Sequence, residues 1–221
     1  SQMGMVLLPV AVEAAGGQPQ GVWYIQTAWG IGGVDLIHPI NRGLYFYDLT
    51  TGENGMALNP DCNFQGISPD LTLAACVQFN GGGSSPMTVH HLSDSTLTMF
   101  ALNAATDRGA GYAVFSPDSQ RAAWLEASGS LTGEPEFKPI IRVGDTSSGA
   151  VLAEMDKTAA AQAAGWGIVT WMKPVGFLDN QTVLVEARGE DWSTVALLKY
   201  DLAANSIGLF HSGSFSGFVY P

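Results

Sequence analysis

Two stretches of the sequence, ISPDLTLAACV at 67–77 and FSPDSQRAAWL at 115–125, decide the fold. Each consists of an apolar residue, a Ser-Pro-Asp triplet that favours a tight turn, and a short run of residues suited to a buried β-strand. A weaker copy, FLDNQTVLVEA, occupies 177–187. The three copies start 48 and 62 residues apart, which is the spacing of a repeated unit of several strands.

A second recurring element follows each of these hairpins. It is clearest as LYFYDLTTG at 44–52 and returns as LLKYDLAANS at 197–206. In the first copy, Tyr45, Tyr47 and Leu49 alternate with Phe46 and Asp48 and lead into a turn rich in Asp, Thr and Gly. This pattern predicts another β-hairpin. The order of the two elements predicts four units of about four strands each, over 20–58, 64–103, 111–156 and 166–211.

Helical periodicity is confined to one segment. Residues 152–164, LAEMDKTAAAQAA, are rich in alanine and precede Gly165. Alanine has the highest helix propensity and glycine commonly ends a helix, so the segment predicts a short helix between the third and fourth units.

The alternation of Ser68-Pro69-Asp70 and Ser116-Pro117-Asp118 with Tyr47-Asp48-Leu49 and Tyr200-Asp201-Leu202 resembles the repeats of TolB-like (WD40-like) β-propellers. The glycine that usually follows the Asp in this family is replaced by leucine and serine, so these turns are not expected to need a positive φ.

The resemblance implies an all-β fold, a β-propeller of four to five blades, each with about four antiparallel strands, in a single domain over 1–221. Two segments outside the four units, 5–13 and 214–220, are expected to be terminal strands that close the ring. The alternative is that one of them is donated to a neighbouring molecule, which would make the protein an assembly subunit.

Charge restricts the partners. Nine Lys and Arg residues against 20 Asp and Glu give a net charge of −11, which repels phosphate backbones. The longest apolar stretch near a terminus, 5–12, is too short for a membrane span and contains Pro9. We therefore expect no nucleic-acid partner and no membrane insertion.

Cys62 and Cys76 are placed symmetrically about Pro69. If a hairpin turns there, the two cysteines lie opposite each other at a distance suited to a disulfide. A disulfide predicts a secreted, periplasmic or cell-surface protein, whereas two buried free thiols would indicate a reducing compartment.

No motif for covalent or metal catalysis is present. The stretch GSFSG at 213–217 has Phe215 where a nucleophile elbow needs its serine, and the adjacent His90 and His91 point to opposite faces of a strand. Glu126 and Glu186 follow predicted inner strands and are the best candidates for a glycosidase carboxylate pair, with strand-end surface charge as the alternative. We expect no catalytic residue, no metal and no cofactor.

Aromatic residues near acids are a stronger indication of ligand binding. Trp29, Trp166 and Trp192, with Asp35 and Asp191, form the predicted ligand-binding set, because aromatic platforms beside carboxylates bind sugars and proteins. The leading hypothesis is a non-enzymatic secreted or cell-surface propeller that binds a protein or polysaccharide partner. The alternatives are a structural subunit that self-assembles through its terminal strands and a small glycoside hydrolase with axial carboxylates.

Overall fold

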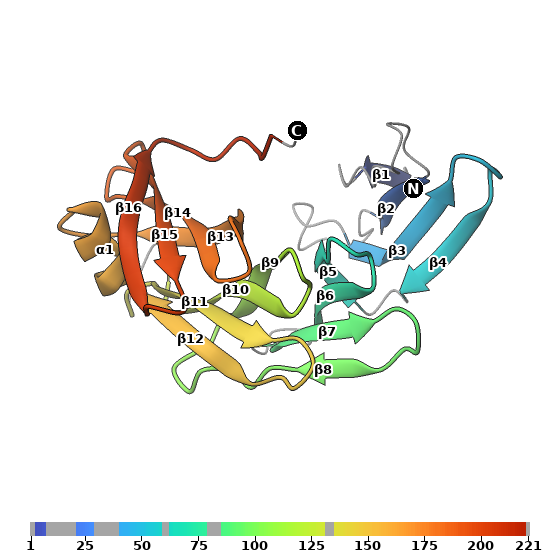
Figure 1. Ribbon diagram of the computed structural model, residues 1–221, viewed down its shortest axis with the longest axis horizontal. Helices are drawn as coiled ribbons and strands as arrows, with labels where there is room; N and C mark the ends of the chain where they lie inside the picture. The colour runs from blue at the N-terminus through green and yellow to red at the C-terminus, as the bar shows by residue number, and fades with distance from the viewer. Residues whose placement is uncertain are drawn as a thin grey trace. The chain divides into compact units, whose positions relative to one another are not determined.

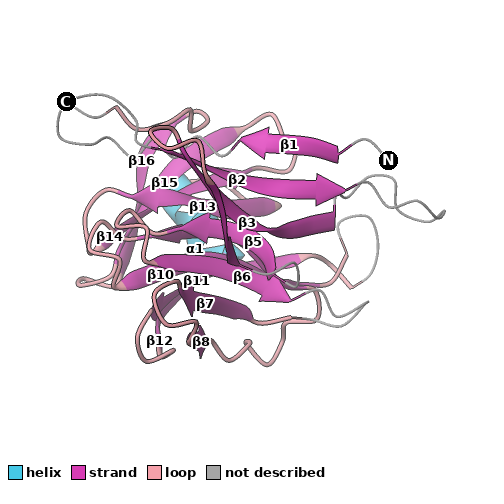
Figure 2. Cartoon of the chain, turned by 90° about the vertical axis from the view of Figure 1, so that its right-hand side faces the viewer, coloured by secondary structure: helices cyan, strands magenta, loops and turns pink. Residues whose placement is uncertain are grey.

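The computed structural model of the chain divides into two compact units, residues 1–64 and 65–221. Strands dominate the described part of the chain, and α1 is its one helix (Figure 2). The structure describes residues 3–7, 21–28, 40–58, 62–78, 85–130 and 135–219.

The first unit holds one antiparallel sheet whose strands follow chain order. Met3–Leu7 pairs with Tyr24–Ala28, so the sheet includes residues well before the predicted start at 20. The predicted terminal strand at 5–13 therefore belongs, as far as residue 7, to the first sheet, and residues 8–13 lie outside the described residues. The strands are β1 (Met3–Leu7), β2 (Gly21–Ala28), β3 (Ile40–Asp48) and β4 (Asn54–Leu58).

Three further four-stranded antiparallel sheets follow, also in chain order (Figure 1). The boundary between the two units falls within β5. The all-β class, with four antiparallel four-stranded sheets and one helix, is as predicted. The strands are β5 (Cys62–Ile67), β6 (Leu73–Gln78), β7 (Met87–His91) and β8 (Leu97–Met99); β9 (Gly109–Phe115), β10 (Arg121–Ser128), β11 (Lys138–Asp145) and β12 (Val151–Asp156); β13 (Trp171–Phe177), β14 (Thr182–Arg188), β15 (Val195–Asp201) and β16 (Ser206–Ser212).

Strand β10 is buried on both faces. Because side chains alternate along a strand, Ala123 and Leu125 point into one hydrophobic cluster, shared with the β13–β16 sheet and α1, while Ala122 and Trp124 point into a second cluster. The second cluster includes the β6 and β7 side chains and Phe100, whose ring centroid lies 4.5 Å from that of Trp124. The β9–β12 sheet is thus the middle layer of the second unit.

The Ser-Pro-Asp turns have the same hydrogen bonds in both copies. Ser68 Oγ donates to Asp70 Oδ1 at 2.6 Å and accepts from the Leu73 N–H at 2.9 Å; Ser116 Oγ has the same two kinds of partner. These turns do use a positive φ although leucine and serine replace the family's glycine. Leu71 and Ser119 have φ of 61° and 60°, and their N–H groups donate to the serine carbonyls and so close the turn.

The later hairpin turns depend on an aspartate at the end of the third strand. Asp145 accepts hydrogen bonds from the backbone and hydroxyl groups of Ser147 and Ser148, and Gly149 completes the turn at φ 73°. Asp48 holds the equivalent turn of the first sheet in the same way. The hydroxyl of Ser147, then the backbone N–H and the hydroxyl of Ser148, lower the pKa of Asp145 to about 2.

Helix α1 (Lys157–Ala164) is shorter than predicted. Residues 152–156 were expected to be helical but belong to β12, where Met155 pairs with Ile141 and is buried in the core. The helix begins only where the Asp156 carboxylate accepts the Ala159 N–H at 2.8 Å. It ends, as predicted, at Gly165, which is left-handed with φ 70°.

The predicted strand at 214–220 is not a strand over 214–219, and residue 220 lies outside the described residues. The segment instead packs on the fourth sheet through side chains. The Phe215 N–H donates to Glu186 Oε2 at 3.0 Å, and Phe218 lies where a Cβ on Gly176 would stand. The predicted closure of a ring by terminal strands stays a prediction.

Asp145 provides a test of the later turns. Its folded pKa lies below the ordinary 3.8, so its ionised form stabilises the fold above about pH 4, and this contribution is lost as the pH falls toward 2. We expect D145N to lower the free energy of unfolding at pH 7 by roughly 1–2 kcal/mol, a figure reduced for solvent screening. Urea unfolding at several pH values measures the difference in free energy of unfolding between wild type and D145N, which should become smaller below pH 4. A difference that does not change with pH would contradict the stabilising role of the ionised Asp145.

Candidate ligand-binding site

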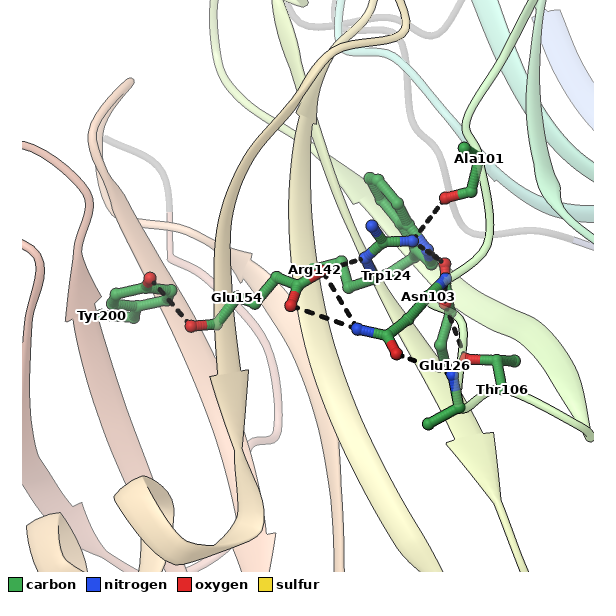
Figure 3. Close-up of polar contacts among 9 residues, drawn as sticks. Ala101, Asn103, Thr106, Trp124, Glu126, Arg142, Glu154 and Tyr200 are labelled. Carbon is green, nitrogen blue, oxygen red and sulfur yellow. Dashed lines mark hydrogen bonds and ion pairs between the residues drawn. The ribbon is translucent and has the colours of Figure 1, made fainter.

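Glu126, the first catalytic candidate, is completely buried in β10. Its Oε1 accepts from Trp124 Nε1 at 2.9 Å and from Arg142 Nη1 at 2.7 Å. Its Oε2 accepts from the Asn103 backbone N–H and the Thr106 hydroxyl, each at 2.9 Å. Figure 3 shows these groups converging on one carboxylate. With four donors satisfied and no exposure to solvent, this carboxylate fixes the segment between β8 and β9.

Arg142 joins this carboxylate to the next strand. Trp124, Arg142 and Glu154 are cross-strand neighbours on β10, β11 and β12. The guanidinium lies 5.7 Å from the Trp124 ring centroid, donates to Glu154 Oε1 at 2.8 Å and donates to the Ala101 carbonyl at 2.6 Å. The Arg142 guanidinium thus pairs with the carboxylates of Glu126 and Glu154. Neither the buried Glu126 nor the buried Arg142 is left without a counter-charge.

Glu186, the second catalytic candidate, is also nearly buried. Arg188 Nη2 contacts its Oε1 at 3.0 Å, and its Oε2 accepts the Phe215 N–H. This carboxylate therefore holds the C-terminal segment against the fourth sheet. The expected alternative of strand-end surface charge was also wrong for both residues, because each side chain is buried rather than exposed.

The predicted ligand-binding residues separate into three groups. Trp192 is 44% exposed on the β14–β15 turn, with φ 61°. Asp191 holds that turn, and the Thr194 backbone N–H, then the Ser193 and Thr194 hydroxyls, lower its pKa. Trp166 is half-buried and packs against the core cluster. The other two, Trp29 and Asp35, lie outside the described residues.

The sequence predicts a disulfide between Cys62 and Cys76. In the structure, Cys76 is buried in β6 and is disulfide-bonded. The side chain of Cys62 lies outside the described residues, so the Cys62–Cys76 pairing stays a prediction.

A hollow of about 290 Å³ lies between the first strands of the three sheets of the second unit. Apolar residues of β9 and β13 form most of its wall, and Gln65 of β5 and Phe215 complete it. Strands β9 and β13 are the edge strands of their sheets, so their outer main-chain groups are not used by a neighbouring strand of the same sheet. The full lining is Gln65, Tyr112, Ala113, Val114, Lys173, Pro174, Val175 and Phe215.

Tyr112 is held in an unfavourable backbone conformation at this hollow. The register of β9 against β10 shifts between Ala123 and Leu125, so that Tyr112 and Ala113 together face one residue. At this bulge Tyr112 has φ 56°, and its N–H donates to Gln65 Oε1 at 2.9 Å. A left-handed conformation costs a non-glycine residue about 1–2 kcal/mol. Burial of the side chain offsets this cost only in part, because 51% of the tyrosine is exposed. Strain of this kind is concentrated at functional sites.

Lys173 is the one charged residue of the hollow. Its Nζ lies 5.9 Å from the Tyr112 ring centroid and 5.6 Å from that of Trp171, within the range of cation–π attraction. The two rings are themselves in edge contact, with centroids 5.8 Å apart. The three side chains form an aromatic and cationic group at the start of β13.

Sequence reasoning missed Tyr112, Trp171 and Lys173. Tyr112 precedes Trp171 by 59 residues and Lys173 by 61, the two regions share no motif, and only the packing of β9 beside β13 brings them together. The one available signal was GAGY at 109–112, where two glycines in a predicted strand suggest a bulge.

Within the described ranges, no cluster of three or more His, Cys, Asp or Glu side chains is arranged to hold a metal. In the same part of the chain, no helix is long and apolar enough to cross a membrane.

Comparison with known proteins places the fold but not the activity. No protein-family model and no curated protein matches the sequence. Acylaminoacyl peptidase from Pyrococcus horikoshii has a similar structure, with a TM-score of 0.57 and 15% identity over 90% of this chain and 32% of that chain. TolB from Acinetobacter baumannii has a TM-score of 0.51 and 15% identity over 89% of this chain and 42% of that chain.

A puromycin-hydrolyzing peptidase from Mycobacterium tuberculosis is also similar, with a TM-score of 0.53 and 13% identity over 95% of this chain and 29% of that chain. The chain thus spans less than half the length of each of these three proteins. At such low identity the similarity concerns the fold alone.

Replacement of Glu126 by Gln tests its structural role. We expect E126Q to lower the free energy of unfolding by about 3 kcal/mol, because Arg142 is left without its buried counter-charge. Denaturant unfolding measures this, with E190Q on the exposed β14–β15 turn as the control that should change stability by less than about 0.5 kcal/mol. An E126Q protein as stable as wild type would return Glu126 to the catalytic candidates.

The strain at Tyr112 predicts an inverted order of two variants. In an ordinary strand, glycine is less stable than alanine by about 0.5–1 kcal/mol. At φ 56°, Y112G should instead be more stable than Y112A by about 1 kcal/mol, because glycine relieves the left-handed strain. Urea unfolding of both variants checks this, and V114G against V114A, two residues along β9, should show the ordinary order. The ordinary order at Tyr112 would mean that the position is unstrained.

Proposed function

We propose that this chain is a non-enzymatic β-propeller domain that binds a protein partner through the hollow at its inner strands. The similarity in fold to TolB supports the resemblance on which the propeller architecture was predicted. In this proposal each of the four sheets is one blade and its first strand is the innermost; β5, β9 and β13 are edge strands of their sheets.

One observation carries the proposal. An exposed tyrosine is kept at a strained bulge, with a lysine against its ring, at the rim of an otherwise apolar hollow. The ring contacts Trp171 and Lys173, but the left-handed backbone costs stability, and strain of this kind is concentrated at functional sites. Aromatic side chains are also common anchors of protein interfaces.

The glycosidase alternative loses its two carboxylates, because Glu126 and Glu186 are buried and hydrogen-bonded within the protein. A polysaccharide partner is less favoured than a protein partner. Sugar hydroxyls need several polar side chains, but Gln65 and Lys173 are the only polar side chains besides the Tyr112 hydroxyl among the residues that line the hollow. Extracellular placement remains part of the proposal and depends on the disulfide of Cys76.

A second candidate, self-assembly, is favoured by β16. This strand is the edge of its sheet and exposes Leu209 and Phe210 by 47% and 50%. An exposed apolar edge strand is a site for pairing with another chain. In this case the edge, rather than a donated terminal strand, would make the contact.

Selection of random peptides displayed on phage tests the leading proposal. Wild-type protein should enrich a family of related peptides, and Y112A should bind them at least about tenfold more weakly, as is typical when an anchor is removed. L152A, which truncates an exposed leucine on β12, is the matched control and should bind as wild type does.

Enriched peptides that bind Y112A equally well would place the binding surface elsewhere. Failure to enrich any peptide, with binding on a glycan array instead, would favour the polysaccharide partner. Light scattering of the same protein gives its mass, and a multiple of 23.3 kDa would support self-assembly.

A further inference from the structure

The hollow contains one charged residue, Lys173. Glu186 is its cross-strand neighbour, but the Glu186 carboxylate forms its ion pair with Arg188 and also accepts the Phe215 N–H. Among the described residues, no carboxylate forms an ion pair with Lys173.

The rings of Tyr112 and Trp171 attract this charge without satisfying its donors. A cation–π contact uses the positive charge, whereas an ammonium group has three N–H donors that need acceptors. The rings therefore position the ammonium group and leave hydrogen-bond donors available to a ligand.

The other residues that line the hollow favour a ligand whose remaining part is apolar. Ala113, Val114, Pro174, Val175 and Phe215 line the hollow and contribute no charged or hydrogen-bonding side chain. A group that fills this hollow buries apolar atoms next to a cation. The complementary molecule carries an anion attached directly to an apolar group.

We propose that the hollow binds an apolar carboxylate, with Lys173 as the carboxylate-binding residue and the β9 and β13 side chains as the apolar pocket. The free C-terminal carboxylate of a peptide that ends in an apolar residue has this chemistry, and so does a small arylalkanoic acid. This inference rests on the proposed function and names the ligand class of the same site.

The overall charge of −11 does not prevent such binding. At physiological salt, charges in solvent are screened over about 8 Å, so a carboxylate in the hollow responds mainly to Lys173 and to its cross-strand neighbour Glu186, whose charge is paired with Arg188. None of the residues that line the hollow is acidic. A carboxylate rather than a phosphate is favoured, because a single lysine matches a single negative charge.

Calorimetric titration of the full chain with matched acid and amide ligands tests the inference. The probes are N-acetyl-Leu-Phe with a free carboxylate, the same dipeptide as its C-terminal amide, and 3-phenylpropanoate. We expect the free acid to bind at least about tenfold more tightly than the amide, the usual scale of a charge-assisted contact. Tight binding of 3-phenylpropanoate as well would identify a small acid as sufficient, and binding of the dipeptide acid alone would identify a peptide terminus.

Two variants separate charge from shape. K173M keeps the length of the side chain and should reduce acid binding to the level of the amide, while K173R should retain the preference for the acid. K138M removes a lysine from the exposed start of β11 and should leave both affinities unchanged. Unfolding curves establish that each variant is folded.

Equal affinity for acid and amide, no binding of either, or an acid preference that survives in K173M would each overturn the inference. The proposed function would still stand if selected peptides bind wild type and not Y112A, because that comparison does not require a free carboxylate. If the selected peptides bind Y112A as well as wild type while the acid preference is lost in K173M, the hollow is a carboxylate site but not the protein-binding surface.

Discussion

The second unit depends on the burial of β10 on both faces. The β6 and β7 side chains cover one face of β10, and β13–β16 with α1 cover the other. The side chains of β10 therefore have almost no contact with solvent. Every polar group on this strand must then find a partner within the protein, since an unpaired buried charge costs several kcal/mol. Glu126, with four donors, and the row Trp124–Arg142–Glu154 satisfy this condition. The network also ties the segment after β8 to the middle sheet, so two sheets are joined by polar contacts as well as by apolar packing.

This constraint has a consequence for function. In the sequence alone, acidic residues that follow predicted inner strands suggest catalysis. In the structure they hold segments in place: Glu126 binds the β8–β9 connection, and Glu186 binds the C-terminal segment. The proposed site instead lies at the edge strands β9 and β13. These strands have bulges, at Tyr112 on β9 and at Val175 on β13, and a bulge turns a side chain away from its regular alternation.

Similarity to TolB and to two peptidases places this fold among proteins of several activities, and a shared fold does not transfer an activity. The site itself is the better guide. A hollow with apolar walls, one lysine and an exposed strained tyrosine is suited to the recognition proposed above.

Local signals in the sequence determined the strands, the Ser-Pro-Asp and Asp-Thr-Gly hairpins, the four repeats and the C-terminal end of the helix, because each depends on residues within a few positions of one another. The start of the helix was misjudged, since the burial of Met155 in the core overrides the helix propensity of its neighbours. Positive φ at Leu71 and Ser119 was also missed, because hydrogen bonds to a serine carbonyl decided it. Apart from the two glycines of GAGY at 109–112, the sequence carries no signal for the candidate site. Tyr112, Trp171 and Lys173 meet only because two sheets pack side by side, and a contact between residues about sixty positions apart leaves no periodic trace in a single sequence.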